Sequence, residues 1–457
     1  MNKKKLFKTI MITLLIFIGL TWVIKTGTYS DAGVFSEGSF APFGIANLFL
    51  VPLQSFQTFS QYGIYLLVVG GFYGILKKTG AYDKIVSKCA GYNKTTFMVV
   101  TVILFALLSS VLGITMGLFV LVPFFKDVLE TMGYDKKNAM LATIGAIFVG
   151  LIGSTLSFEV NGYINYFYKV GYNELIIYKV ILLVILTLLL IVYIKKSNKN
   201  FDSKKLEVKG NVKTIPALII AILTVLLGFV GMYSWYHAHN IAIFDDLHTA
   251  ITDIKIGNFS ILSNIIGQNT SALGRWSELD FSALLLISSL IISWIYGLKT
   301  KEIYEGFVDG AKELLPMAIF VSLSFVLFMP LYTSSNMQSI FYTIFNKIIG
   351  LADKVSIVPM TLLSSIGTIF YGQFIYLASD LSTPLAKAYT DSYPLMTLIM
   401  QTIYGLTSFL APTSMLLLGG LAYFDINYKD WMKHIFKFLL IALGILIVTF
   451  LIIGWAS

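Results

Sequence analysis

Small clusters of glycine, serine, threonine and one carboxylate interrupt the apolar stretches of this sequence. In the first part of the chain the candidate binding residues are Ser109, Ser110, Gly113, Thr115, Gly153, Ser154, Thr155 and Glu159. In the second part they are Ser364, Ser365, Thr368, Pro412, Thr413 and Ser414. Carbonyl and hydroxyl oxygens coordinate cations, whereas the N–H groups exposed where a helix breaks attract an anionic group. The clusters therefore predict binding of a small charged ligand.

The rest of the composition indicates that these clusters lie inside a membrane. Of the 457 residues 57% are hydrophobic and 12% are charged, and the mean hydropathy is +0.80. Soluble domains have about a quarter charged residues. Apolar runs at 175–194, 216–235 and 435–453 match the roughly 20 residues that a membrane-spanning helix needs. We therefore predict an all-α polytopic protein of the cytoplasmic membrane, with the lipid bilayer as a partner.

Lysines set the expected orientation. Lys3, Lys4, Lys5 and Lys8 precede the first apolar stretch, at 9–25, and predict a cytoplasmic N-terminus. We expect this stretch to be a retained helix, because no convincing cleavage site follows it. The net charge of +9 comes largely from lysines beside apolar spans, so it indicates topology rather than nucleic-acid binding. The single cysteine, Cys89, cannot form an intramolecular disulfide.

Charge and hydropathy divide the chain into two halves. The most charged run, 195–213, predicts a cytoplasmic linker between a first transmembrane half, 1–194, and a second, 214–457. The second half contains a polar outer loop at 237–280. The apolar segment 46–58 is short and contains Pro52, which favours an interfacial position over a full crossing.

One order of elements recurs in both halves. The apolar stretch 95–125 is too long for one crossing and has lysines at both ends, so we predict a re-entrant hairpin with Ser109 and Ser110 at its tip. A second hairpin is predicted at 356–387, with the corresponding pair Ser364 and Ser365 at its tip. Each is followed by an interrupted span, at 138–168 and at 394–422, where Pro412 favours a break. The second copy has the opposite expected orientation. Inverted repeats with broken helices around a midplane site are typical of secondary transporters.

Several alternatives bear on this interpretation. Small hydroxyl residues often serve only helix packing, but four clusters at matching places favour a site. Glu159 either faces a cavity or marks the outer interface, and both interpretations stay open. All four histidines lie outside the predicted spans, and phosphate-loop and nucleophile-elbow motifs are missing, so we expect neither an enzyme nor a metal site or cofactor. A passive channel remains the alternative function.

Three runs resemble a known family: LLVVGGFYGILKKTGAYDKI at 66–85, GLIGSTLS at 150–157, and FLAPTSMLLLGGLAYFDINYKDWMKHI at 409–435. They are similar to YfcC-type carriers of the ion transporter superfamily, relatives of anaerobic dicarboxylate carriers and aminobenzoyl-glutamate transporters. The resemblance runs from about residue 60 to the end. It implies a scaffold and a moving transport domain, an elevator-like motion and a homodimer. It also implies that the serine, threonine and proline clusters of both halves form the site.

The resemblance further implies an amino-acid or carboxylate substrate, moved by an antiporter or a symporter with Na⁺ or H⁺ as the candidate coupling ion. Relatives often carry an acidic pair after the first hairpin turn, where this chain has Gly113-Ile-Thr-Met-Gly117, and Met415 stands where a glycine is expected. These departures weaken the expectation of a cationic amino acid and keep a short-chain or dicarboxylate carrier as an alternative. The only arginine, Arg275, falls in the outer loop, so a substrate carboxylate must be met by helix ends and hydroxyls.

Overall fold

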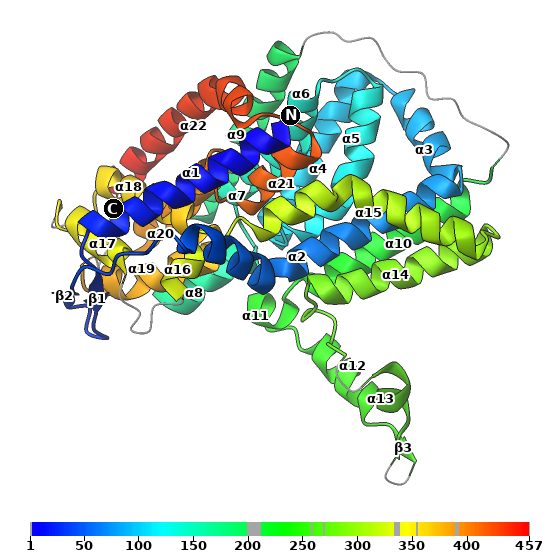
Figure 1. Cartoon of the computed structure of the whole chain (residues 1–457), viewed down its shortest axis with the longest axis horizontal. Helices are drawn as coiled ribbons and strands as arrows, with labels where there is room; N and C mark the ends of the chain where they lie inside the picture. The colour runs from blue at the N-terminus through cyan, green and yellow to red at the C-terminus, as the bar shows by residue number, and fades with distance from the viewer. Residues whose placement is uncertain are drawn as a thin grey trace.

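The computed structural model describes residues 2–198, 212–256, 259–267, 270–332, 339–352, 355–388 and 393–456. Most of the predicted linker at 195–213 therefore lies outside the described residues. The chain is helical almost throughout, as Figure 1 shows, with two short antiparallel strand pairs. These are β1 (Gly27–Tyr29) with β2 (Phe35–Glu37), and β3 (Lys255–Ile256) with β4 (Phe259–Ser260). The prediction of an all-α polytopic protein is confirmed.

The helices of the first half follow the predicted order. They are α1 (Asn2–Val23), α2 (Asn47–Lys78), α3 (Ala81–Ala90), α4 (Lys94–Leu112), η1 (Gly117–Leu121), α5 (Val122–Thr131), α6 (Lys136–Met140), η2 (Leu141–Gly145), α7 (Ala146–Ile152), η3 (Phe158–Gly162), α8 (Tyr163–Tyr168) and α9 (Ile176–Ser197).

The second half begins with α10 (Ile215–Met232) and a lobe that extends away from the rest of the chain (Figure 1). The lobe contains α11 (Trp235–His239), α12 (Ile243–Thr252), β3, β4 and α13 (Ile261–Ile266). The remaining helices are α14 (Glu278–Ile295), α15 (Thr300–Ser322), α16 (Phe328–Tyr332), α17 (Ile340–Ile349), α18 (Ile357–Tyr371), α19 (Phe374–Ala388), α20 (Tyr393–Ser408), α21 (Met415–Tyr423) and α22 (Tyr428–Ala456).

Within the described ranges, seven helices are long and apolar enough to cross a membrane. They are α1, α2, α4, α9, α10, α14 and α22. Their outward-facing leucines and isoleucines are exposed, whereas buried apolar side chains from both halves form one continuous core. This distribution is what lipid-facing helices around a packed interior require.

Helix α2 includes the segment 46–58, for which the sequence favours an interfacial position. The helix runs over 32 residues, with Pro52 inside its first turns. A kink at Phe59, where φ is −107° and ψ is 16°, separates this first part from the rest of α2. The part after the kink continues to Lys78 and rises about 28 Å, close to the roughly 30 Å hydrocarbon core. The interfacial position of 46–58 stays a prediction.

Both predicted hairpins turn at a glycine in the left-handed backbone region. The first runs from α4 through Gly113, with φ of +72°, into η1 and α5. The second runs from α18 through Gly372, with φ of +68°, into α19. A side chain is strained in this backbone region, which explains why glycine stands at both turns.

Both predicted broken helices are interrupted as well. In the first, α7 ends at Ile152 and η3 begins at Phe158, so 153–157 forms the break. In the second, α20 ends at Ser408 and α21 begins at Met415, so 409–414 forms the break. Helices α7 and α20 pack antiparallel, since Phe148 contacts Phe409 whereas Ile152 lies against Gly405. Antiparallel packing of corresponding helices is what an inverted repeat requires.

The halves also meet where α2 crosses α15, and Figure 1 shows these two helices side by side. Gly70 and Gly74 of α2 lie against Gly310 and Gly306 of α15, again antiparallel. A Cβ atom added to Gly74 would lie 2.0 Å from the carbonyl oxygen of Gly306. The glycines therefore allow backbone-to-backbone contact between the halves.

Candidate functional site

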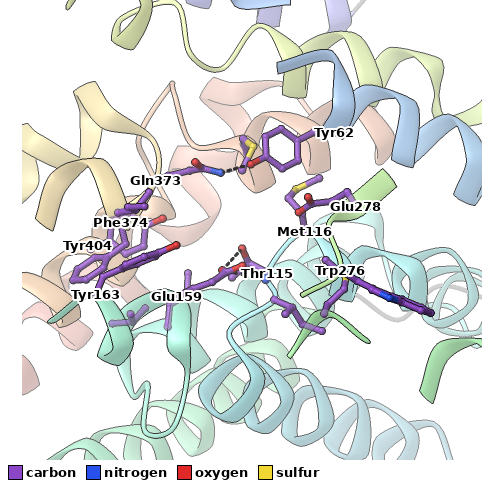
Figure 2. A pocket seen from close by; sticks show the side chains of 16 residues that line it. Tyr62, Thr115, Met116, Glu159, Tyr163, Trp276, Glu278, Gln373, Phe374 and Tyr404 are labelled. Carbon is purple, nitrogen blue, oxygen red and sulfur yellow. Dashed lines mark hydrogen bonds between the residues drawn. The ribbon is translucent and has the colours of Figure 1, made fainter. Parts of the chain in front are cut away.

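A cavity of about 240 Å³ lies between the two hairpin turns and the two broken helices. It is also bordered by α2, by the end of α10 and by the start of α14. Figure 2 shows the side chains that surround it. The lining residues are Tyr62, Ile114, Thr115, Met116, Leu151, Glu159, Val160, Tyr163, Met232, Trp276, Glu278, Gln373, Phe374, Ile375, Tyr404 and Met415.

The hairpin turns supply corresponding parts of the lining. In the first half, the N–H of Gly113 donates to the carbonyl of Ser109 at 3.1 Å, and the following Ile114, Thr115 and Met116 face the cavity. In the second half, the N–H of Gly372 donates to the carbonyl of Thr368 at 3.2 Å. The three residues after it, 373–375, face the cavity. Each left-handed glycine thus ends one helix and directs the next three residues into the same space.

Two carboxylates line the cavity, Glu159 after the first break and Glu278 at the start of α14 (Figure 2). Glu159 Oε2 accepts from the hydroxyl of Thr115 at 3.3 Å. Glu278 takes its place because a capping box between Ser277 and Asp280 begins α14 at this point. The lining contains no lysine, arginine or histidine, so no cationic side chain of the wall balances these two carboxyl groups.

Aromatic side chains and one amide form much of the remaining wall. Tyr62, Tyr163, Trp276, Phe374 and Tyr404 surround the carboxylates. The amide of Gln373 donates to the hydroxyl of Tyr62 at 2.9 Å, which connects the second hairpin turn to α2. Aromatic faces attract cations as well as apolar groups, so this wall suits a ligand that carries both.

Helix N-termini provide the opposite polarity on the side of the second half. Phe374 and Ile375 begin α19, and Met415 begins α21. The first N–H groups of a helix have no partner within the helix and carry a partial positive charge. The cavity can therefore receive a carboxylate at these two helix ends and a positive group at Glu159 and Glu278.

The other predicted residues of the first half lie behind this lining, in a seam between hairpin and break. The hydroxyl of Ser110 donates to the carbonyl of Gly153 at 2.6 Å, and the N–H of Thr155 donates to the carbonyl of Ser110 at 3.0 Å. The hydroxyl of Ser109 donates to the carbonyl of Ile147 at 2.8 Å. Ser154 is fully buried in the same seam. These groups bind one another, and only Thr115 and Glu159 reach the cavity.

The second half has a similar seam with different members. The hydroxyl of Thr413 donates to the carbonyl of Ile369, three residues before Gly372, as Ser110 stands three residues before Gly113. Ser414 caps α21 by accepting from the N–H of Leu417. Pro412 lies in the break between α20 and α21.

Ser364 and Ser365 were expected at the second hairpin tip, but the structure places them two turns before it, inside α18. Thr368, which the sequence also singled out, corresponds to Ser109 by its bond from the turn glycine. The predicted pairing of Ser109 and Ser110 with Ser364 and Ser365 is therefore wrong. Repeated serines suggested it, whereas the left-handed glycines define the turns.

Most cavity residues were not anticipated. The predicted outer loop 237–280 includes Glu278, but the structure begins α14 there. The Ser277–Asp280 capping pattern could have identified that helix start. The tyrosines carried no distinguishing signal, because aromatic residues are frequent throughout this chain. Within the described ranges no three histidine, cysteine, aspartate or glutamate side chains come together as a metal site. Arg275 pairs with Asp245 in the lobe, at 2.5 Å.

Two solved transporter structures align with nearly the whole chain. The Alcanivorax borkumensis YdaH transporter is 11% identical, with a TM-score of 0.42, over 100% of this chain and 99% of that one. Neisseria gonorrhoeae MtrF, described among antimetabolite efflux pumps, is 12% identical, with a TM-score of 0.35, over 96% and 94%. No curated protein matches the chain significantly.

The sequence model of one protein family covers almost all of the chain. It is the model of the C4-dicarboxylate anaerobic carriers, DcuC, and it matches residues 4–455. That span includes both hairpins, both breaks and every residue that lines the cavity. The chain therefore belongs to the C4-dicarboxylate anaerobic carrier family.

Proposed function

We propose that this protein is a secondary active transporter that moves an amino acid or a small carboxylate across the cytoplasmic membrane by ion coupling or exchange. Family membership supports a carrier rather than an enzyme. The observation that carries the proposal is the cavity between two inverted hairpin turns, with carboxylates on one side and helix N-termini on the other. Such a midplane site between repeats is what alternating access requires.

The polarity of the lining bears on the substrate. A zwitterion matches both sides of the cavity, because its carboxylate meets the starts of α19 and α21 while its amino group meets Glu159 and Glu278. A dicarboxylate, the substrate that the family description names, brings two negative charges toward two carboxylates. It is compatible with the cavity when protons or sodium ions accompany it. The cavity thus favours the amino acid, and the dicarboxylate is the second candidate.

The proposal includes three further elements from the resemblance to YfcC-type carriers. They are an elevator-like motion of a transport domain against a scaffold, a homodimer, and exchange of related substrates. The extensive packing of α2 against α15 supports a rigid scaffold that contains both helices. The lysines at the start of α1 support a cytoplasmic N-terminus.

Reconstitution tests the function. Purified protein in liposomes is assayed for uptake of radiolabelled amino acids and dicarboxylates, with Na⁺ gradients, pH gradients or internal counter-substrate. We expect accumulation against a concentration gradient for at least one compound, and loss of it in Glu159→Gln. Flux that never exceeds equilibration under any gradient, with the protein folded, would establish the passive channel instead.

A labelling experiment tests the orientation. In a Cys89→Ser background, Lys255→Cys in the lobe and Lys301→Cys at the start of α15 offer exposed positions. We expect a membrane-impermeant maleimide to label the first from outside intact cells and the second only after permeabilisation. Labelling of both from the same side would contradict the predicted crossing of α14 between them.

A further inference from the structure

Two buried residues occupy corresponding positions in the helices that follow the broken helices. Lys179 is the fourth residue of α9 and is 3% exposed, and Trp431 is the fourth residue of α22 and is fully buried. Both point toward the break of their own half. Trp431 Nε1 donates to the carbonyl of Phe409 at 2.9 Å. Lys179 Nζ donates to Asn161 Oδ1 at 2.6 Å. At this position the first half therefore has an ammonium, and the second half has a neutral indole.

The ammonium belongs to a network around the carbonyl end of α7. Asn161 Nδ2, on the same amide that Lys179 binds, donates to the carbonyl of Ser154 at 3.1 Å. Gln401 Nε2 donates to the same carbonyl at 2.9 Å and to that of Ile152 at 3.3 Å. The C-terminal end of a helix carries a partial negative charge of about half a unit. The positive charge of Lys179 thus lies one side chain away from that negative end.

No carboxylate in the described part of the chain forms an ion pair with this lysine, and Glu174 attracts it only from a longer distance. None of the ion pairs found in the described part of the chain includes Lys179. A buried ammonium is costly unless nearby groups compensate its charge. The structure provides the carbonyl end of α7, which Lys179 reaches through Asn161, and the more distant carboxylate of Glu174. Gln401 Oε1 is a further buried oxygen there without a hydrogen-bond partner.

Among the described residues, no charged side chain donates a hydrogen bond to the second break. The carbonyl of Phe409 accepts from the indole of Trp431, and the carbonyl of Leu410 accepts from the hydroxyl of Tyr428. Both donors are neutral. The two breaks therefore differ in charge although their backbones follow the same plan.

We propose that Lys179 is a tethered cation, whose ammonium stands beside the first break in the place of a small diffusible cation. A carrier built in this way has a covalently attached cation at one break and leaves only the second half for a coupling ion. The role of Lys179 in ion coupling rests on the proposed transport function. The position of its ammonium beside the first break does not. Lys179 acts here as a positioning residue, through Asn161, because it does not line the cavity.

Two substitutions at Lys179 separate charge from hydrogen bonding. Lys179→Gln keeps an N–H donor for Asn161 and removes the charge, whereas Lys179→Met removes both. We expect either variant in detergent to lose roughly 3 °C or more in melting temperature. Sodium or lithium chloride should raise the melting temperature of these variants part of the way back, with a saturable dependence on salt concentration. Equimolar choline chloride should not do so. Lys437→Gln is the matched control, because Lys437 is an exposed lysine of the other closing helix, α22.

Equilibrium binding of radioactive sodium provides the direct measurement. We expect Lys179→Gln to bind about one more sodium ion per protomer than the wild-type protein or Lys437→Gln. Equal sodium binding and equal salt response in all three proteins would overturn the proposal. If Lys179→Met cannot be purified, Lys179→Gln decides the question.

Neither measurement depends on transport. Failure of uptake therefore contradicts the proposed function alone, and failure of the sodium response contradicts the tethered cation alone.

Discussion

The two halves of this protein meet in two contrasting ways. Where α2 crosses α15, glycines bring the backbones into direct contact and leave no space between them. Where the hairpin turns approach each other, larger side chains end at a cavity of about 240 Å³ with two carboxylates in its wall. The same inverted relationship thus gives a sealed contact at one place and a binding space at the other. Side-chain size and polarity decide which of the two forms.

The largest expected effect comes from filling the sealed contact. Gly74→Leu places a side chain where a Cβ atom alone would lie 2.0 Å from the carbonyl oxygen of Gly306. We expect a loss of about 3 kcal/mol or more in stability, because the backbones must separate. Thermal unfolding in detergent and size-exclusion chromatography measure it. Gly444→Leu is the control, since a Cβ atom at Gly444 of α22 has no neighbour within 4 Å. Equal melting temperatures would show that the crossing is not tightly packed.

Neutralising the cavity carboxylates should abolish most function without unfolding the protein. For Glu159→Gln and for Glu278→Gln we expect a fall of about 10- to 100-fold in transport, the range for losing a hydrogen bond to a charged group. Uptake into liposomes measures this, with melting temperatures near that of the wild type. Glu37→Gln in strand β2, an exposed carboxylate paired with Lys25, should change neither. Full activity in both cavity variants would exclude this cavity as the substrate site.

A smaller effect is expected from the link between α2 and the second hairpin turn. Tyr62→Phe removes the hydroxyl that accepts from Gln373 at 2.9 Å and keeps the ring. We expect the apparent substrate affinity to weaken about 2- to 10-fold, consistent with one neutral hydrogen bond. Concentration dependence of uptake measures it, with Tyr92→Phe, an exposed tyrosine, as the control. An unchanged affinity would indicate that α2 does not help to shape the cavity.

The smallest effect is expected at Ser365. Its hydroxyl lies 3.4 Å from that of Thr407, and it does not line the cavity. Ser365→Ala should leave transport within about twofold and stability within about 0.5 kcal/mol of the wild type. A large loss of transport would show that Ser365 contributes to the site. It would also contradict the alignment of the two hairpins by Gly113 and Gly372.

The sequence predicted the hairpins and broken helices better than it predicted the individual residues that line the cavity. Hairpins and breaks were predictable because glycine and hydroxyl residues cluster at these places inside long apolar stretches, and because Pro412 favours a break in a helix. The contact of Gly70 and Gly74 with Gly310 and Gly306, in contrast, follows only from the structure. Gly306 and Gly310 lie in a span with many charged residues, where a small-residue spacing attracts less notice.

Positions in the cavity depend on how distant segments come together. Tyr62, Tyr404 and Glu278 come from three helices that are far apart in sequence, and their convergence follows from tertiary packing. The sequence could not decide whether Glu159 faces a cavity or lies at the outer interface, because these two positions are only one helical turn apart. The structure places it in the cavity, against Thr115.

Each hairpin turn is fastened to the break of its own half by a hydrogen bond to a backbone carbonyl. The carbonyl of Ser110 accepts from the N–H of Thr155, and the carbonyl of Ile369 accepts from the hydroxyl of Thr413. These bonds couple turn and break within each half, so the proposed transport motion would open the cavity by changing the distance between two such units. A ligand that contacts both Thr115 and Gln373 would fix the distance between the two hairpins. Spectroscopic distances between probes on the two hairpins would then report occupancy even before the natural cargo is known.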